Sequence, residues 1–396
     1  MDATPGKLLV VDDNEANRDM LSRRLSRRGH EVTVAEDGYQ AIEMVKQQDF
    51  DVVLLDIVMP GIDGLEVLKV LRQTHSASEL PIIMATARDE SADIVQALKL
   101  GASDYVTKPL DFPVVVARVQ TQLSLKRAQE ALESANRRMK SDLEAAARVQ
   151  RALLPSAAPL SEHARFAWKY RPCDELGGDS LNVFPIDHRH VALYVLDVSG
   201  HGVPAALLAV TVTRNLTLHE DRSSIITEPG ATPGERTIAS PLSVIEQLNR
   251  MYPMDSEARL YFTILYGILD LMTGHFRYVA AGHPGPILAP SSGQPQLFDS
   301  SGNPVGLLEE AEFEERTLDV EVGDRLYLHS DGLDEQRNSS GEPFGRERLR
   351  DAIAWEREVP LQASLDHLVD EVVAWRGDER LDDDVSILAV ERPVPG

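Results

Sequence analysis

The sequence predicts three parts. An α/β domain with a doubly wound, five-stranded parallel sheet occupies residues 1–122, a helical coiled-coil linker 123–154, and an α+β domain with antiparallel sheets flanked by helices 155–396. Short continuous apolar runs alternate with stretches of helical period in the first part, as in strands buried on both faces of a parallel sheet. The middle part contains neither glycine nor proline before Pro155. Short strands joined by tight turns fill the last part, which indicates antiparallel pairing.

Composition limits the classes of function. A chain of 396 residues is too long for one ordinary core. Its net charge of -24 argues against binding to nucleic acid or to anionic membranes, because such binding rests on lysine and arginine. The one cysteine, Cys173, excludes an intramolecular disulfide and a zinc site built of thiolates. No apolar run is long enough to cross a bilayer and the first strand begins too early for a secretory signal, so we expect a cytoplasmic protein.

Polar side chains follow the strands expected in the first domain. The runs are KLLVVDD, EVTVAE, DVVLLD, PIIMAT and DYVTK. Because the carboxyl ends of parallel strands meet at one edge of a sheet, five side chains should share a crevice there: Asp12, Asp13, Asp56, Thr86 and Lys108. Clustered carboxylates without cysteine or histidine suit magnesium, and a carboxylate beside the metal and opposite a lysine can accept a phosphoryl group. The alternative is a set of polar strand caps.

The motifs VVDD, LLDIVMPGIDG, MATA and DYVTKP resemble those of the receiver domain of bacterial two-component response regulators. The resemblance implies that Asp56 is phosphorylated by a cognate histidine kinase or another phosphodonor. It implies a magnesium ion held by Asp12, Asp13, Asp56 and the carbonyl of Val58. It also implies three residues of the phosphorylation switch: Thr86, Tyr105 and Lys108. A receiver serving only for constitutive dimerisation is the alternative, which loss of Asp56 or Lys108 would have favoured.

Apolar residues recur at an interval of seven along the linker. They are Leu125, Leu132, Met139, Ala146 and Leu153, with Ala128, Ala135 and Val149 at the companion position and Asp142 breaking it. This spacing predicts a short coiled coil, weakened by its alanines, and therefore a homodimer. The alternative is a single helix laid on a domain surface.

The last part begins after Pro155. It contains the strand-like runs HVALYVLDVS, YFTILYGILDL, HFRYVAAG, DRLYLHSDG and VSILAVERP. Turns such as DLMTGH are too short for a crossover and join antiparallel neighbours. Residues 220–241 are rich in serine, threonine, proline and glycine and predict a mobile surface insertion.

Four acidic turns or strand ends stand out in this part. They are GGDSLN with Asp179, LDVSGHG with Asp197, LHSDGLDE with Asp331, and LDDDVSIL with Asp382, Asp383 and Asp384. Carboxylates from four positions far apart in the sequence would have a common role if they bound the same two divalent ions. Such a metal pair can activate a bridging water and bind a phosphate. Ser199 and His201 raise the alternative of a serine nucleophile. Two of the four acidic stretches, GGDSLN and LDDDVSIL, contain no histidine, which argues against a Ser/His/Asp relay.

The motifs RVQRALLP, GGD, DVSGHGVPAALLA, AAGHPGPIL, GNPVGLL, SDGLDEQRN and DDDVSIL resemble those of metal-dependent serine/threonine phosphatases of the protein phosphatase 2C class, in its bacterial sporulation and stress-response branch. The resemblance runs from about residue 147 to 393. It implies a catalytic site with two Mn²⁺ or Mg²⁺ ions, in which Asp197 bridges both and the Val198 carbonyl, Asp331, Asp383 and Asp179 complete the ligands.

Two departures accompany this resemblance. Asn182 stands where many relatives have a second aspartate after GGD, and Ser199 stands where other members of the class have a histidine that serves as general acid. His201 and His283 are the candidates for protonating the leaving group. The expected substrate is a phosphorylated partner protein such as an anti-sigma-factor antagonist. A pseudophosphatase that binds a regulatory partner without turnover is the alternative.

Overall fold

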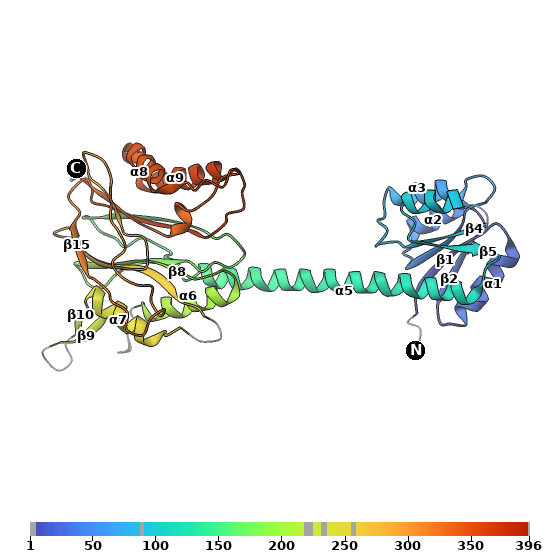
Figure 1. Ribbon diagram of the computed structural model, residues 1–396, viewed down its shortest axis with the longest axis horizontal. Helices are drawn as coiled ribbons and strands as arrows, with labels where there is room; N and C mark the ends of the chain where they lie inside the picture. The colour runs from blue at the N-terminus through green and yellow to red at the C-terminus, as the bar shows by residue number, and fades with distance from the viewer. Residues whose placement is uncertain (1–4, 88–90, 218–224, 231–235, 255–258, 395–396) are drawn as a thin grey trace. The chain divides into compact units, whose positions relative to one another are not determined.

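The computed structural model divides into two compact units, Met1–Lys140 and Ser141–Gly396 (Figure 1). It describes residues 5–87, 91–217, 225–230, 236–254 and 259–394. None of the helices in these ranges is long and apolar enough to cross a membrane.

The first unit is built around a parallel sheet with the strand order β2-β1-β3-β4-β5. Its strands are β1 (Lys7–Val11), β2 (Glu31–Ala35), β3 (Val52–Asp56), β4 (Ile82–Ala87) and β5 (Asp104–Lys108). Its helices are α1 (Glu15–Ser26), α2 (Gly38–Gln47), α3 (Gly64–Arg72), α4 (Ser91–Lys99) and the first part of α5 (Phe112–Arg151). α1 and α5 pack on one face of the sheet, and α2, α3 and α4 on the other. The predicted doubly wound α/β fold is confirmed.

Side-chain caps begin the helices that follow β1, β2 and β3. Asn14 accepts hydrogen bonds from two amides at the start of α1, and Asp37 and Asp63 each accept one at the starts of α2 and α3. These caps satisfy amides that have no partner within the helix. α3 begins so close to the end of β3 that a Cβ on Gly64 would lie 2.1 Å from the carbonyl oxygen of Asp56.

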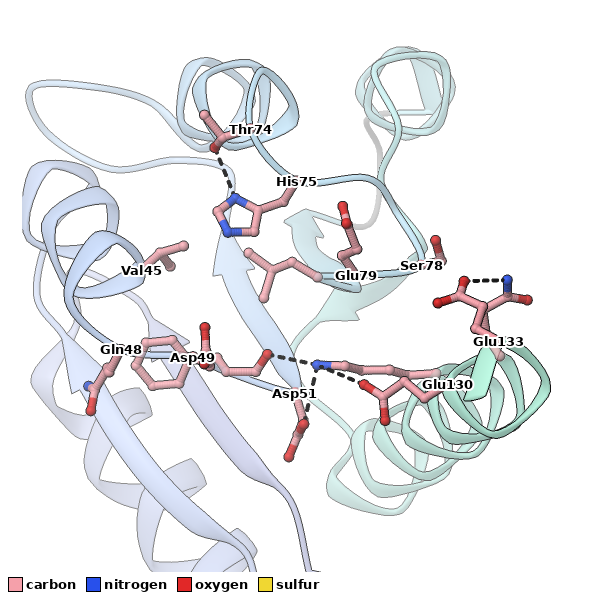
Figure 2. A pocket seen from close by; sticks show the side chains of 14 residues that line it. Val45, Gln48, Asp49, Asp51, Thr74, His75, Ser78, Glu79, Glu130 and Glu133 are labelled. Atoms are coloured by element: carbon pink, nitrogen blue, oxygen red, sulfur yellow. Dashed lines mark hydrogen bonds and ion pairs between the residues drawn. The ribbon is translucent and has the colours of Figure 1, made fainter. Parts of the chain in front are cut away.

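α5 is a single helix of 40 residues, so the last helix of the first unit and the predicted linker are continuous. Lys126 fixes it to the first unit, since its Nζ donates to the Phe50 carbonyl at 3.1 Å and to Asp51 Oδ1 at 3.2 Å. Figure 2 shows the pocket beside this contact, with Glu130 and Glu133 of α5 on one side and Glu79 on another. Residues 128–142 are exposed all round the helix among the residues that the structure describes.

The second unit is a sandwich of two antiparallel sheets, which confirms the predicted α+β class. One has the order β15-β12-β11-β8-β7 and the other β14-β13-β16-β17-β6. The first comprises β7 (Ser180–Pro185), β8 (His190–Val198), β11 (Phe262–Asp270), β12 (His275–Ala281) and β15 (Arg316–Asp319). The second comprises β6 (Arg165–Arg171), β13 (Ile287–Ala289), β14 (Gln296–Leu297), β16 (Arg325–His329) and β17 (Val385–Glu391).

An apolar core fills the space between the two sheets. Helices α6 (Val203–Asn215) and α7 (Pro241–Met251) pack outside the first sheet. Helices α8 (Gly345–Trp355) and α9 (Leu361–Arg376) pack outside the second. The sheets are therefore buried on both faces, which accounts for their nearly continuous apolar strands.

The predicted insertion at 220–241 falls partly on residues 220–224 and 231–235, which lie outside the described residues. In its described part, β9 (Thr227–Pro229) and β10 (Arg236–Ile238) form a two-stranded antiparallel sheet. The serine and proline content did not predict this hairpin.

Candidate functional site

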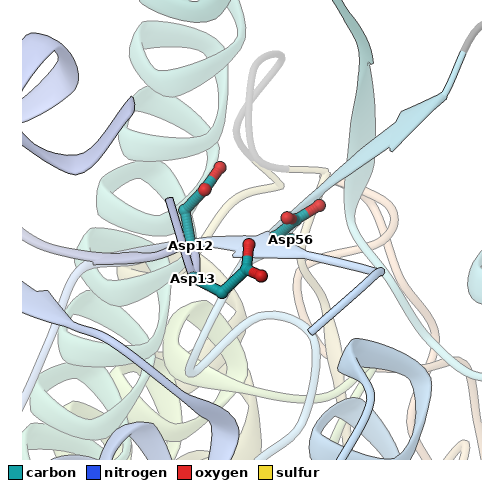
Figure 3. Close-up of side chains that lie close together, drawn as sticks. All are labelled: Asp12, Asp13 and Asp56. Atoms are coloured by element: carbon teal, nitrogen blue, oxygen red, sulfur yellow. The ribbon is translucent and has the colours of Figure 1, made fainter. Parts of the chain in front are cut away.

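Three carboxylates of the first unit meet at the carboxyl ends of β1 and β3. Oxygen atoms of Asp12, Asp13 and Asp56 lie within 4.8 Å of one another (Figure 3). Asp12 and Asp56 are buried, whereas Asp13 is exposed. Among the residues that the structure describes, this is the one group of three acidic, histidine or cysteine side chains whose ligand atoms are so close.

Lys108 supplies the positive charge of this crevice. Its Nζ lies 2.6 Å from Asp56 Oδ2 and 3.1 Å from Asp12 Oδ2. Burial raises the pKa of Asp56, and the hydrogen bond from Lys108 partly opposes that rise. Burial also works against the charged form of Lys108, but the two carboxylates prevail and its pKa is raised. One ammonium faces three carboxylates, so the crevice retains negative charge that a divalent cation would balance.

The remaining predicted receiver residues surround this crevice at different depths. Thr86, near the end of β4, is buried. Tyr105 of β5 is half-buried against the core that contains α3 and α4. Val58, in the loop after β3, is 65% exposed.

The four acidic positions of the second unit lie at strand ends of both sheets. Asp179 directly precedes β7, and Asp197 is the penultimate residue of β8. Asp331 begins the short helix η1 (Asp331–Leu333) after β16, and Asp383 lies two residues before β17. β17 lies against β7 and β8 across the sandwich, and the carboxylates affect one another's pKa values although they are up to about 200 positions apart.

Burial and mutual repulsion raise the pKa values of these carboxylates. Burial, followed by Asp197 and Asp384, raises the pKa of Asp179 well above its ordinary range. Burial, followed by Asp331 and Asp383, raises the pKa of Asp197 to about 7. Burial and Asp383 raise the pKa of Asp331 to about 6. Ionising all of them requires nearby positive charge.

Glycines let these turns approach each other. A Cβ on Gly178 would lie 2.9 Å from the carbonyl oxygen of Val198. A Cβ on Gly332 would lie only 1.9 Å from the carbonyl oxygen of Asp384. Both positions therefore require glycine, because any side chain would push apart the segments that carry the acidic residues.

Two residues that organise the site were not predicted. Asp384 is buried, and its carboxylate accepts hydrogen bonds from the amides of Cys173 at 2.8 Å and Asp179 at 3.2 Å. Gln336 is also buried; it accepts from the Asp382 amide at 2.9 Å and donates to the Asp383 carbonyl at 3.1 Å. Asp384 thus fixes the GGD segment, and Gln336 fixes the Asp383 segment beside the turn of Asp331.

The end of α5 also contacts the GGD segment. Gln150 Nε2 donates to the Gly177 carbonyl at 2.6 Å, and the Gly177 amide donates to Gln150 Oε1 at 3.4 Å. Ala147 of α5 packs with Leu176 and with Ala206 of α6. The sequence signal for this contact is the RVQ of RVQRALLP, which gives no role to the glutamine by itself.

Ser199 and His283 have structural partners. The Ser199 amide donates to the Tyr261 carbonyl at 3.0 Å, and the Tyr261 amide donates to Ser199 Oγ at 3.1 Å. His201 Nδ1 faces Asp174 and not Ser199, so no Ser/His relay is formed. His283 is buried against Thr263, and burial lowers its pKa to about 3. A neutral, buried imidazole cannot protonate a leaving group.

Asn182, where many relatives have an aspartate, lies within β7. Its side-chain oxygen accepts from the Val183 amide at 2.8 Å. It therefore adds no negative charge to the four acidic positions.

The donor set fits divalent cations. Asp179 Oδ2 is buried and has no hydrogen-bond partner within the described part of the chain. A buried carboxylate oxygen without a partner is costly unless a cation contacts it. Asp179, Asp197, Asp331, Asp383 and the Val198 carbonyl offer the oxygen ligands that magnesium and manganese prefer.

Comparisons with known proteins agree with both halves of this description. The family described as response regulator receiver domain matches residues 8–120, and the family described as stage II sporulation protein E matches residues 187–393. The SiaA-PP2C domain of Pseudomonas aeruginosa is 22% identical, with a TM-score of 0.52, over 65% of this chain and 98% of that one. This likeness shows the fold of the second unit.

Two further structures are similar over single parts. The PP2C phosphatase domain of SpoIIE from Bacillus subtilis, with a fragment of its regulatory domain, is 19% identical with a TM-score of 0.48, over 59% of this chain and 64% of that one. The receiver domain of the Francisella response regulator 1452 is 31% identical with a TM-score of 0.29, over 30% of this chain and 97% of that one.

The match over residues 187–393 spans more than half of the chain, and that over 8–120 covers nearly all of the parallel-sheet unit. The chain belongs to the stage II sporulation protein E family of protein phosphatase 2C-like proteins and carries a response regulator receiver domain at its N-terminal side.

Proposed function

We propose that the protein hydrolyses phosphoserine or phosphothreonine on a partner protein, under the control of phosphorylation at Asp56. The proposal is supported by the mutual electrostatic influence of acidic residues beside β7, β8, β16 and β17, which contributes to their raised pKa values, and by an unpartnered oxygen on Asp179. Such a cluster is poised for two divalent ions. When bound, these ions would activate a water and neutralise phosphate oxygens.

Some of these residues would bind the ions, and others position the residues that do. Asp197 would bridge the two ions, Asp331 and Asp383 would complete one set of ligands, and Asp179 and the Val198 carbonyl would serve the other. The side chains of Asp384 and Gln336 hold the acidic segments in place through hydrogen bonds to backbone atoms. Asp383 and His201 are exposed, so a phosphorylated side chain on the surface of a folded protein can reach the rim.

A phosphoprotein substrate is favoured over a small phosphate ester by the family of the chain. We propose that the substrate is a phosphorylated switch protein, such as an anti-sigma-factor antagonist. For the receiver, we propose that Asp12, Asp13, Asp56 and the Val58 carbonyl hold magnesium. Thr86 and Lys108 would contact the phosphoryl group that a histidine kinase or other phosphodonor delivers. The side chain of Tyr105 would reorient when Asp56 is phosphorylated.

The test is hydrolysis of a phosphoserine protein with and without added Mn²⁺. Asp197→Asn should lower the rate by at least about a hundredfold, because it weakens a ligand shared by both ions. Asp370→Asn, an exposed aspartate on α9, is the matched control and should keep the wild-type rate. Ser199→Ala should retain most activity, because the hydroxyl accepts a backbone hydrogen bond and has no basic partner.

Full activity of Asp197→Asn, or of wild type in excess chelator, would contradict the metal site. Loss of turnover in Ser199→Ala with metals still bound would favour a serine nucleophile. A wild-type protein that binds the phosphoprotein but never releases phosphate would favour the pseudophosphatase.

A further inference from the structure

A threonine hydroxyl lies beside the aspartate that would bridge the two ions. Thr263 of β11 is the direct partner of Asp197 of β8 in the antiparallel ladder. Side chains of directly opposite residues point to the same face of a sheet, with Cβ atoms about 4.5–5.5 Å apart. That face is turned toward the second sheet, because Val195 and Leu265, two residues away along each strand, belong to the core between the sheets. Thr263 therefore borders the same space as Asp197.

A buried histidine is bonded to this hydroxyl. His283 Nδ1 lies 2.8 Å from Thr263 Oγ1. The histidine follows β12 and is 1% exposed. The Gly282 amide before it donates to the Gly302 carbonyl at 3.0 Å, and a Cβ on Gly282 would lie 2.6 Å from Pro304 Cγ. Close packing around this loop therefore holds the imidazole against Thr263.

The histidine gives the hydroxyl a direction and no charge. Burial lowers the pKa of His283 to about 3, so the imidazole is neutral. Among the described residues, the Thr263 hydroxyl bonds to His283 and not to the Asp197 carboxylate across the ladder. A carboxylate accepts hydrogen bonds, so a hydroxyl proton turned toward Asp197 would have made that bond. We infer that the proton lies toward Nδ1, which leaves the lone pairs of Oγ1 free for a donor.

We propose that Thr263, oriented by His283, is a positioning residue for the water that attacks phosphorus. The assignment rests on the proposed phosphatase function. The carboxylates of the site and the oxygens of a phosphate ester accept hydrogen bonds, whereas a water donates them. A hydrogen bond from the water to Thr263 Oγ1 uses one of its protons and leaves a lone pair on its oxygen to be aimed at phosphorus. His283 acts only through Thr263.

Other roles of Thr263 predict different kinetics. A residue that positions the water affects kcat on every substrate, because the same water attacks each of them, and leaves KM unchanged. A residue that contacts the protein part of the substrate changes KM for that substrate alone. A residue that only supports the metal ligands lowers the affinity for Mn²⁺.

The experiment measures kcat and KM of the full chain for a phosphoserine peptide and for p-nitrophenyl phosphate, and its affinity for Mn²⁺ by titration calorimetry. Thr263→Val removes the hydroxyl with little change of shape. It should lower kcat about tenfold on both substrates, the effect of one hydrogen bond, with KM and Mn²⁺ affinity unchanged. Thr263→Ser keeps the hydroxyl and should stay within about threefold of wild type. Thr317→Val, at an exposed position of β15 in the same sheet, is the matched control and should change neither rate.

A double-substitution cycle tests whether His283 acts through Thr263. His283→Asn keeps a hydrogen-bonding atom near the place of Nδ1 and should stay within about threefold of wild type, whereas His283→Leu should lower kcat about tenfold. Added to Thr263→Val, His283→Leu should cost no further kcat, because the hydroxyl that it orients is already gone. Circular dichroism shows whether the buried His283→Leu variant folds, and the half-buried Thr263→Val tests the proposal if it does not.

Wild-type kcat in Thr263→Val, or a Thr263→Ser variant as slow as Thr263→Val, would overturn the assignment. A loss confined to the phosphopeptide, a lower Mn²⁺ affinity in Thr263→Val, or additive losses in the double variant would overturn it too. A wild-type protein that binds Mn²⁺ and hydrolyses neither substrate would overturn the proposed function, and this assignment with it. Activity of the wild type on both substrates therefore separates failure of the positioning role from failure of the phosphatase.

Discussion

At the scale of single residues, the carboxylates of the second unit make the metal-free protein sensitive to pH. Asp197 and Asp331 have an ordinary pKa of 3.8, and the fold raises these values to about 7 and about 6. The folded state therefore binds these protons more tightly than the unfolded chain does. The resulting stability is fully present below about pH 4 and is lost as the pH rises through 6 and 7.

We therefore expect the Tm of the protein in chelator to fall by about 3–8 °C between about pH 5 and pH 8. Asp197→Asn removes one titrating group and should make this decline shallower. Added Mn²⁺ should raise the Tm more at the higher pH, where the ligands are ionised. Thermal unfolding followed by circular dichroism measures all three. A decline of equal slope in wild type and Asp197→Asn would show that Asp197 does not titrate in this range.

The sequence identified some acidic residues of the candidate site more clearly than others. Asp179, Asp197 and Asp331 adjoin glycines or turns, which set them apart as candidates. Asp384 was not distinguished from its two neighbours, since three consecutive aspartates look alike until the strand direction is known. The structure buries Asp384 directly before β17 and leaves Asp383 exposed. Gln150 was missed for a similar reason, because a helical pattern does not reveal which domain a given face contacts.

At the scale of elements, α5 presents an apolar stripe that no other described residue buries. Leu125, Leu132 and Met139 are 59%, 56% and 60% exposed. Their interval of seven residues is that of a coiled coil. The sequence predicted the helix from its lack of glycine and proline, and the structure confirms it, with a start at Phe112. Pairing with a second copy stays a prediction, since it is a property of two chains.

We expect the protein to sediment as a dimer through this stripe. Leu132→Asp with Met139→Asp would place charges at the seam and should yield the monomer mass, while the matched control Lys140→Asp, off the stripe, should leave the dimer intact. Analytical ultracentrifugation of the full chain measures the mass. A monomer in wild type, or a dimer unchanged by the double substitution, would contradict the coiled coil.

At the scale of the whole molecule, one helix has contacts in both units. Lys126 of α5 is hydrogen-bonded to the segment just before β3 in the first unit, and Gln150 of α5 is hydrogen-bonded to the GGD segment in the second. We propose that phosphorylation of Asp56 changes the phosphatase rate through this helix. A continuous helix transmits a rotation or a shift that a flexible linker would absorb. A coupling of about 1–3 kcal/mol suffices for a change of several-fold to about a hundredfold.

The most direct test is the rate of phosphate release from a phosphoserine protein with and without beryllofluoride, which mimics the phosphoryl group at Asp56. We predict that beryllofluoride raises the rate at least several-fold in wild type and has no effect in Asp56→Asn. Two glycines inserted near Ser134 should abolish the response while the basal rate persists, and a response that survives them would remove the helix as its carrier. Equal rates with and without beryllofluoride in the wild-type protein would contradict receiver control of the phosphatase.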